Sequence, residues 1–155
     1  MLDPEHKLKL LIANRPWETE PDNAEWVDTV TGYKCRIQRH EAFGSLCGYV
    51  GIPKTHTLHG KGYDDLDIRV HGGLTYADDC DEDWGGGLWW FGFDCSHGGD
   101  LVPKLMLTML EQGYDYERTE VYRTWEYVEN EVRELVRQLR DEDSLANQIP
   151  NFRRA

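Results

Sequence analysis

The chain has 155 residues, of which 39% are hydrophobic and 12% aromatic, with a mean hydropathy of −0.69. That is enough apolar material for one domain with a buried core, and it excludes an intrinsically disordered chain. The formal net charge is −12, and residues 61–100 hold ten acidic but only two basic residues. Such a chain repels a phosphate backbone, so we expect no direct nucleic-acid binding.

The targeting and cysteine patterns are those of a cytoplasmic protein. The first seven residues are acidic rather than basic, no apolar run approaches the length of a membrane span, and we expect no membrane association. The four cysteines are isolated, without the close pairs from which structural zinc sites are built. We expect free thiols, at Cys35, Cys47, Cys80 and Cys95.

The N-terminal half predicts a short helix and then strands. Asp3 and Pro4 resemble a helix start, and the apolar residues that follow as far as Ile12 predict a short helix ending near Asn14, so residues 1–23 are assigned to a helix and a loop. Residues 25–28 and 33–40 flank a turn that contains Thr31 and Gly32, which predicts a hairpin. A third strand is expected over residues 45–52, and Pro53 should end it.

Two further strands are predicted on either side of an acidic loop. Residues 67–76 alternate between apolar and polar side chains, the period of a half-buried strand. Residues 88–95 are almost continuously apolar, which is typical of a central strand covered on both faces. The connections are too short for helical crossovers, so the sheet should be mainly antiparallel.

The C-terminal part predicts helices. Residues 103–112, followed by Gly113, indicate a short helix. Apolar residues at helical spacing predict a long helix over residues 118–140 with Thr119 as its N-cap, followed by a polar tail. The predicted fold class is therefore α+β, with a mainly antiparallel sheet of about four or five strands packed against a long C-terminal helix. We assign one domain, 1–155, with the sheet in 24–100, helices in 101–140 and the tail in 141–155.

The segment WWFGFDCSHGGD, residues 89–100, concentrates chemical groups. It ends a hydrophobic strand with two aspartates and a histidine, just where the chain turns at two glycines. Ionisable groups at the end of a buried strand are held rigidly in a low dielectric, which shifts their proton affinities. The strand predicted beside it carries His71 and Thr75, which we expect near the same turn.

Four segments carry a resemblance to a known family: GYVGIPKTHTLHG (48–60), HGGLTY (71–76), WWFGFDCSHGGDLVP (89–103) and YRTWEYVENEV (122–132). Together they resemble a family of small bacteriophage and prophage proteins, over roughly the last two-thirds of the chain. The resemblance implies a viral setting, and with it the host cytoplasm, but it brings no activity with it. Small phage accessory proteins often act against host defences, some by sequestering nucleotide signals.

The preferred site hypothesis is a pocket that binds a small polar or nucleotide-like ligand between aromatic walls and a few fixed polar groups. Arg123 is the candidate for gripping a phosphate. The predicted ligand-binding residues are His71, Thr75, Trp90, Asp94, His97, Asp100, Arg123 and Tyr127.

Other chemistry is open to the same residues. Imidazole and carboxylate suit a divalent metal, which makes one a candidate cofactor. The predicted metal ligands are His71, Asp94, His97 and Asp100. Alternatively, the carboxylates bond the amides of the glycine-rich turn. Cys95 is a candidate nucleophile, although buried cysteines are usually inert. Residues 79–83 resemble the start of a calcium loop, but Trp84 stands where glycine is required.

Three functions follow from these alternatives. In the first, which we favour, a phage accessory protein binds a small ligand and sequesters a host defence signal. In the second, the same residues form a metal-dependent hydrolase. In the third, the acidic surface blocks a host protein that normally binds nucleic acid. The partner is thus a small molecule or a host protein, and both enzymatic activity and oligomeric state stay open.

Overall fold

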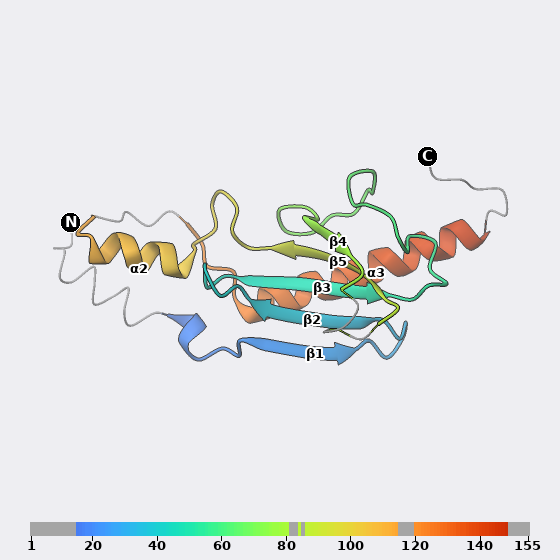
Figure 1. Ribbon diagram of the computed structural model, residues 1–155, viewed down its shortest axis with the longest axis horizontal. Helices are drawn as coiled ribbons and strands as arrows, with labels where there is room; N and C mark the ends of the chain where they lie inside the picture. Colours follow the sequence, from blue (N-terminus) through green and yellow to red (C-terminus); the bar gives the residue numbers. More distant parts are fainter. Residues whose placement is uncertain (1–14, 81–83, 85, 115–119, 149–155) are drawn as a thin grey trace.

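The computed structural model describes residues 15–80, 84, 86–114 and 120–148. The described elements begin with the 3-10 helix η1 and continue with five strands and two α-helices (Figure 1). Their bounds are η1 Pro16–Glu18, β1 Asn23–Val27, β2 Lys34–Arg39, β3 Leu46–Ile52, β4 Tyr76–Asp78, β5 Trp89–Asp94, α2 Pro103–Glu111 and α3 Trp125–Gln148. The helix predicted before residue 15 lies outside the described residues.

The five strands form one antiparallel sheet in the order β1-β2-β3-β5-β4. The α+β class, the antiparallel sheet and the long C-terminal helix are therefore confirmed. The turn of the first hairpin forms because Asp28 Oδ2 accepts hydrogen bonds from the backbone N–H and the hydroxyl of Thr31, at 2.9 and 2.7 Å. Gly32 follows at φ +76°, in the left-handed region that favours glycine.

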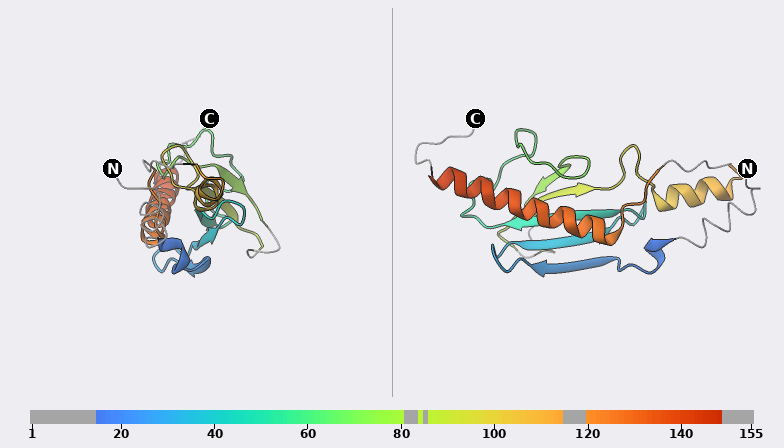
Figure 2. Two further views of the ribbon diagram at one scale, coloured as in Figure 1. Left: turned by 90° about the vertical axis from the view of Figure 1, so that its left-hand side faces the viewer. Right: turned by 180° about the vertical axis from the view of Figure 1, so that it is seen from behind.

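Helix α3 lies across one face of the sheet and buries the main core (Figure 2). Gly48 on β3 allows this close approach, because a Cβ there would stand 2.6 Å from the Phe93 ring and 2.7 Å from Val132. Phe91 and Phe93 of β5 face the helix. Because side chains alternate along a strand, Trp90 on the same strand faces away from the helix. We call the face of the sheet away from α3 the open face.

The strand predicted over residues 67–76 is wrong for most of its length, because only Tyr76–Asp78 pair as β4. Gly72 and Gly73 adopt positive φ and turn the chain before it. The backbone of Arg69 bonds instead to the side-chain amide of Gln138 on α3, at 2.7 and 2.9 Å. The alternation reflects real burial, since Ile68 packs in the core, but the backbone hydrogen bonds go to a helix side chain.

Helix α3 starts later and ends later than its spacing predicts. The N–H of Tyr127 bonds to the Thr124 hydroxyl, and the Glu20 carboxylate accepts the N–H of Trp125 at 2.8 Å. Thr119 lies outside the described residues. Val121 is not helical, because its backbone bonds to Gly99 and Leu101. The polar tail predicted from residue 141 is wrong as far as Gln148, which ends the helix.

Candidate functional site

Seven of the eight predicted site residues meet at one corner of the molecule, where β5 ends and α3 begins. We call them the corner cluster. Its members are His71, Thr75, Asp94, His97, Asp100, Arg123 and Tyr127. The sequence hypothesis that these residues converge is thus consistent with the geometry. Trp90 is the exception, and it lies on the open face.

Asp100 is the centre of the corner cluster. Its side chain is 1% exposed. Its oxygens accept hydrogen bonds from His71 Nε2 at 2.7 Å, from Arg123 Nε at 2.9 Å and from the backbone N–H of His97 at 3.0 Å. Burial acts to raise the pKa of Asp100, but these bonds together outweigh it and leave the pKa lowered. The carboxylate is therefore charged at neutral pH and already accepts three hydrogen bonds from the chain.

His71 and Arg123 both contact Tyr127, in addition to Asp100. The second ring nitrogen of His71 lies 2.8 Å from the Tyr127 hydroxyl, and the two rings meet edge to face at 5.4 Å. The guanidinium of Arg123 lies 5.1 Å from the centre of the Tyr127 ring. His71, Arg123 and Tyr127 thus each have a partner within the chain.

Asp94 forms the outer part of the corner cluster. It accepts the Thr75 hydroxyl at 3.1 Å and the backbone N–H of Ser96 at 3.0 Å. His97 Nε2 lies 3.3 Å from Asp94 Oδ1 without hydrogen-bond alignment. The His97 ring packs over Gly72, where a Cβ would stand 2.3 Å from it.

The geometry of the corner cluster is that of a structural network. The predicted metal ligands separate into two pairs, and Asp100 already carries a guanidinium partner. Among the described residues, no group of three or more His, Cys, Asp or Glu side chains is arranged to hold a metal. Burial also raises the pKa of the Cys95 thiol, which disfavours the thiolate that nucleophilic attack needs.

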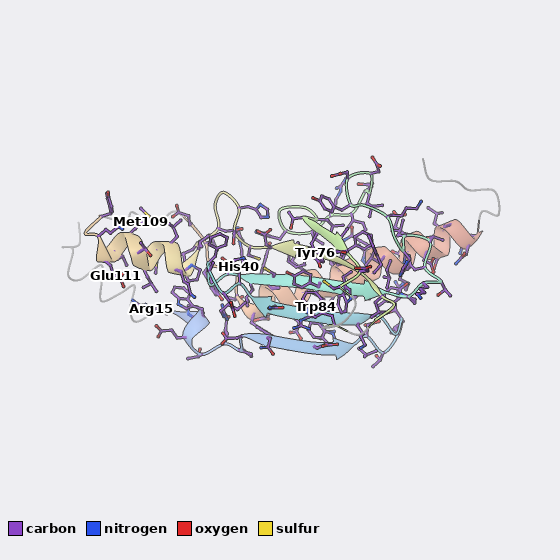
Figure 3. All side chains as sticks on the ribbon, in the orientation of Figure 1. Arg15, His40, Tyr76, Trp84, Met109 and Glu111 are labelled. Carbon is purple, nitrogen blue, oxygen red and sulfur yellow. The ribbon has the colours of Figure 1, made fainter. Side chains whose placement is uncertain are left out.

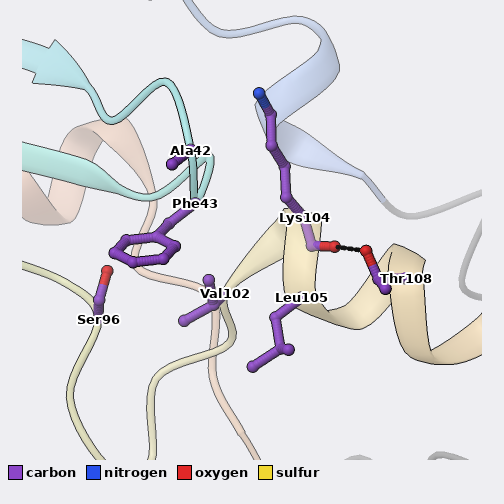
Figure 4. Close-up of a pocket in the computed structure, with 7 residues that line it drawn as sticks. All are labelled: Ala42, Phe43, Ser96, Val102, Lys104, Leu105 and Thr108. Atoms are coloured by element: carbon purple, nitrogen blue, oxygen red, sulfur yellow. Dashed lines mark hydrogen bonds between the residues drawn. The ribbon is translucent and has the colours of Figure 1, made fainter.

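A cavity of about 380 Å³ lies between the β2–β3 turn and helix α2 (Figure 4). Phe43, Val102 and Leu105 give it an apolar lining, and Phe43 and Leu105 are among the exposed large hydrophobic residues. We call it the apolar groove.

The open face carries a second cavity, of about 460 Å³, with aromatic walls. Tyr49 contacts Trp84 and Tyr76 edge to face, with ring centres 4.8 and 5.5 Å apart. All three side chains are half-buried and line the cavity. Figure 3 shows Tyr76 and Trp84 over the sheet and His40 toward the end of the open face. We call this the aromatic cavity, and its volume is within the range that small ligands occupy.

The aromatic cavity exists because glycines face large rings across the strands. A Cβ on Gly92 would stand 2.4 Å from the Tyr49 ring, and one on Gly51 would stand 2.9 Å from the Trp90 ring. Trp90 is fully buried beneath Trp84, at a ring distance of 5.1 Å. The glycines thus let the aromatic side chains lie flat enough to leave a hollow.

Three buried polar atoms on this face have no hydrogen-bond partner among the described residues. Arg36 Nε, Gln38 Oε1 and Trp90 Nε1 are buried and form no hydrogen bond with any described residue. Gln38 lines the aromatic cavity. A buried carbonyl oxygen without a donor costs roughly 1–3 kcal/mol, which a bound donor would recover. The open face therefore offers an unsatisfied acceptor beside aromatic walls.

A third cavity, of about 780 Å³, adjoins the aromatic cavity. The two share Gln38, Arg39, His40 and Glu41, and the third is also lined by Asp22, Asn23 and Lys104. We call it the polar cavity.

Sequence reasoning missed the aromatic cavity because its members lie far apart in the chain. Tyr49, Tyr76 and Trp84 come from β3, β4 and the segment before β5. One signal was available: Tyr49 alternates with the core positions Leu46, Val50 and Ile52, so its side chain points to the opposite face of the sheet. An aromatic residue on a face that lacks a helix indicates a stacking surface.

Comparison with protein-family models, with curated proteins and with solved structures finds no match to this chain. Within the described residues, neither α-helix has the combined length and apolarity that crossing a membrane requires.

Proposed function

We propose that this protein binds a small planar ligand of the nucleobase type in the aromatic cavity. The observation that carries the proposal is the buried, unpartnered carboxamide oxygen of Gln38 beside three aromatic rings. Base–aromatic stacking contributes roughly 1–3 kcal/mol per base. The exocyclic amino group of a base is the donor that a carboxamide oxygen accepts.

The unpartnered oxygen of Gln38 favours a base over a quaternary ammonium cation as the ligand. Aromatic side chains also bind quaternary ammonium groups. Such a cation has no N–H to give to Gln38, so the buried oxygen would stay unsatisfied. Arg36 already lies 4.3 Å from the centre of the Trp84 ring and supplies a cation there. A flat ligand with hydrogen-bond donors fits both features of the cavity.

The biological role that we propose is retention of the ligand rather than its conversion. The resemblance to phage proteins adds the setting, in which binding removes a host signal that contains a nucleobase from solution. The corner cluster, the other region of concentrated polar chemistry, is proposed to hold β5 and α3 together.

Thermal shift and calorimetry with the free bases adenine, guanine, cytosine and uracil test the proposal. We expect at least one base to bind the wild type, and both Trp84→Ala and Gln38→Leu to weaken it about tenfold. Tyr114→Ala, an exposed aromatic residue away from the cavity, is the matched control. Binding of choline but of no base would contradict the proposal, as would loss of base binding in His97→Ala but not in Trp84→Ala.

A further inference from the structure

The polar cavity extends the aromatic cavity at one end of the open face, because the two share four lining residues. A ligand whose ring stacks on Trp84 therefore has a second compartment beside it. Building on the proposed function, we infer that the ligand is a nucleoside whose sugar hydroxyls occupy the polar cavity and which carries no polyphosphate.

Arg39 is the strongest cation that lines the polar cavity, yet it has no donor to spare. Its Nε bonds to Asp22 at 2.9 Å, and one terminal nitrogen bonds to the Gly44 carbonyl and the Tyr122 hydroxyl. The other bonds to Glu20 and the Pro21 carbonyl. A guanidinium has five N–H donors, and all five are engaged. Arg39 therefore shapes the cavity without offering a phosphate clamp.

The remaining cation of the polar cavity, Lys104, is engaged through one of its three N–H donors. The ammonium of Lys104 donates to the backbone carbonyl of Glu41. Two carboxylates, Asp22 and Glu41, line the same space. A polyphosphate needs several unpaired cationic donors and a positive field, whereas among the described lining residues only Lys104 has cationic N–H groups to spare, and the net charge of the chain is −12.

The groups that remain match hydroxyls. His40 Nδ1 accepts the backbone N–H groups of Ala42 and Phe43, both at 3.2 Å, so the ring hydrogen belongs on Nε2 and serves as a donor. The carboxylate of Glu41 is an acceptor on the same lining. A vicinal diol both donates and accepts, and a carboxylate is the group that commonly binds ribose hydroxyls. The polar cavity thus favours the sugar of a nucleoside.

Calorimetry on the full chain tests this assignment with matched ligands. The probes are the four ribonucleosides, their free bases, the 2′,3′-dideoxy form of the tightest nucleoside and its 5′-triphosphate. We expect that nucleoside to bind about tenfold tighter than its base, the factor of one well-made hydrogen bond. The dideoxy form should lose that gain, and the triphosphate should bind no tighter than the nucleoside.

Glu41→Gln is the diagnostic variant, because its side chain lies in an exposed turn and its loss does not threaten the fold. It should weaken nucleoside binding more than base binding, whereas Glu111→Gln on α2 should change neither. Equal affinity for base, nucleoside and dideoxynucleoside would overturn the inference and leave the proposed function standing. A triphosphate that binds tighter than the nucleoside would also overturn it. No binding by any base or nucleoside would overturn both.

Discussion

At the scale of single residues, Asp100 shows how a predicted site residue can be structural. Its carboxylate is almost fully buried and bonds to an imidazole, a guanidinium and a backbone N–H. Three hydrogen bonds from the chain itself thus occupy acceptor positions that a ligand or metal would use. The residue fixes the turn after β5 against the start of α3.

The first prediction concerns the pH dependence of this carboxylate. The folded state lowers the pKa of Asp100 below its ordinary value of 3.8. The carboxylate therefore stabilises the fold above that value, and its contribution is lost as the pH falls through the lower pKa of the folded state. We expect Asp100→Asn to reduce the free energy of unfolding at neutral pH by about 2 kcal/mol.

Urea unfolding followed by circular dichroism between about pH 5 and pH 2 measures this difference. The gap between wild type and Asp100→Asn should narrow as the pH falls. Asp65→Asn, at an exposed position, is the control and should track the wild type. A gap that stays constant or widens at low pH would show that the charge of Asp100 does not stabilise the fold.

The carboxylate of Glu20 forms a second network of hydrogen bonds within the chain. Burial and the bond to Glu20 raise the pKa of the Tyr122 hydroxyl, which donates to that carboxylate at 2.5 Å. Glu20 also accepts the N–H of Trp125 at the start of α3. One carboxylate thus joins the segment before β1 to the last helix.

At the scale of elements, the seating of α3 on the sheet depends on a few close contacts. Gly48 on β3 faces Phe93 and Val132, and the space for a methyl group is absent. His56 is buried in the loop after β3, where its ring bonds to the Leu139 carbonyl at 2.8 Å. The helix is therefore fixed near both its start and its later turns.

The second prediction follows from that packing. Gly48→Ala should reduce the free energy of unfolding by roughly 1–3 kcal/mol, because the added methyl group pushes α3 away from the sheet. Gly62→Ala is the matched control, since no atom lies within 4 Å of its Cβ position and its φ is ordinary. Chemical denaturation of both variants gives the comparison, and equal stability of the two would refute the close approach of α3.

The third prediction tests the cap on α3. Glu20→Ala removes acceptors for Trp125 and Tyr122 and should reduce the free energy of unfolding by roughly 1–3 kcal/mol. Glu18→Ala, which removes only an exposed ion pair with Arg15, should cost less than about 1 kcal/mol. Thermal or urea unfolding reads out both, and a Glu20→Ala protein as stable as Glu18→Ala would rule out the cap.

Local patterns predicted most elements because their hydrogen bonds are local or run between neighbouring strands. The hairpin, β3, β5 and α2 follow from alternation, turn residues and a terminal glycine. The conformation of residues 67–76 was not predicted, because the hydrogen-bond partner of the Arg69 backbone is a side chain on α3 that no local pattern reveals. The start of α3 was not predicted for a similar reason, since the Glu20 carboxylate that accepts the N–H of Trp125 lies 105 residues earlier in the chain.

The sequence likewise predicts one part of the candidate site and not the other. Convergence of His71, Asp94 and Asp100 could be inferred from neighbouring segments, and the structure brings them together. Their engagement within the chain could not be inferred, because it depends on Arg123, just before α3, and on Tyr127 in α3. The aromatic cavity needs three elements in register, and the sequence gives only the side on which each ring lies.

At the scale of the whole molecule, the two faces of the sheet have different roles. One is sealed by α3 and forms the core, and the other carries half-buried aromatic rings, unpartnered polar atoms and two adjoining cavities. The corner cluster closes the end of the sheet between them. We therefore propose the open face as the place where a ligand binds.

The most direct test is a heteronuclear NMR titration of the isotope-labelled protein with the four ribonucleosides. We expect shifts in the Trp84 indole N–H and the Gln38 side-chain amide, with little change at Arg123 Nε. Shifts centred on Arg123 and the imidazoles of His71 and His97, with Trp84 and Gln38 unmoved, would contradict this expectation.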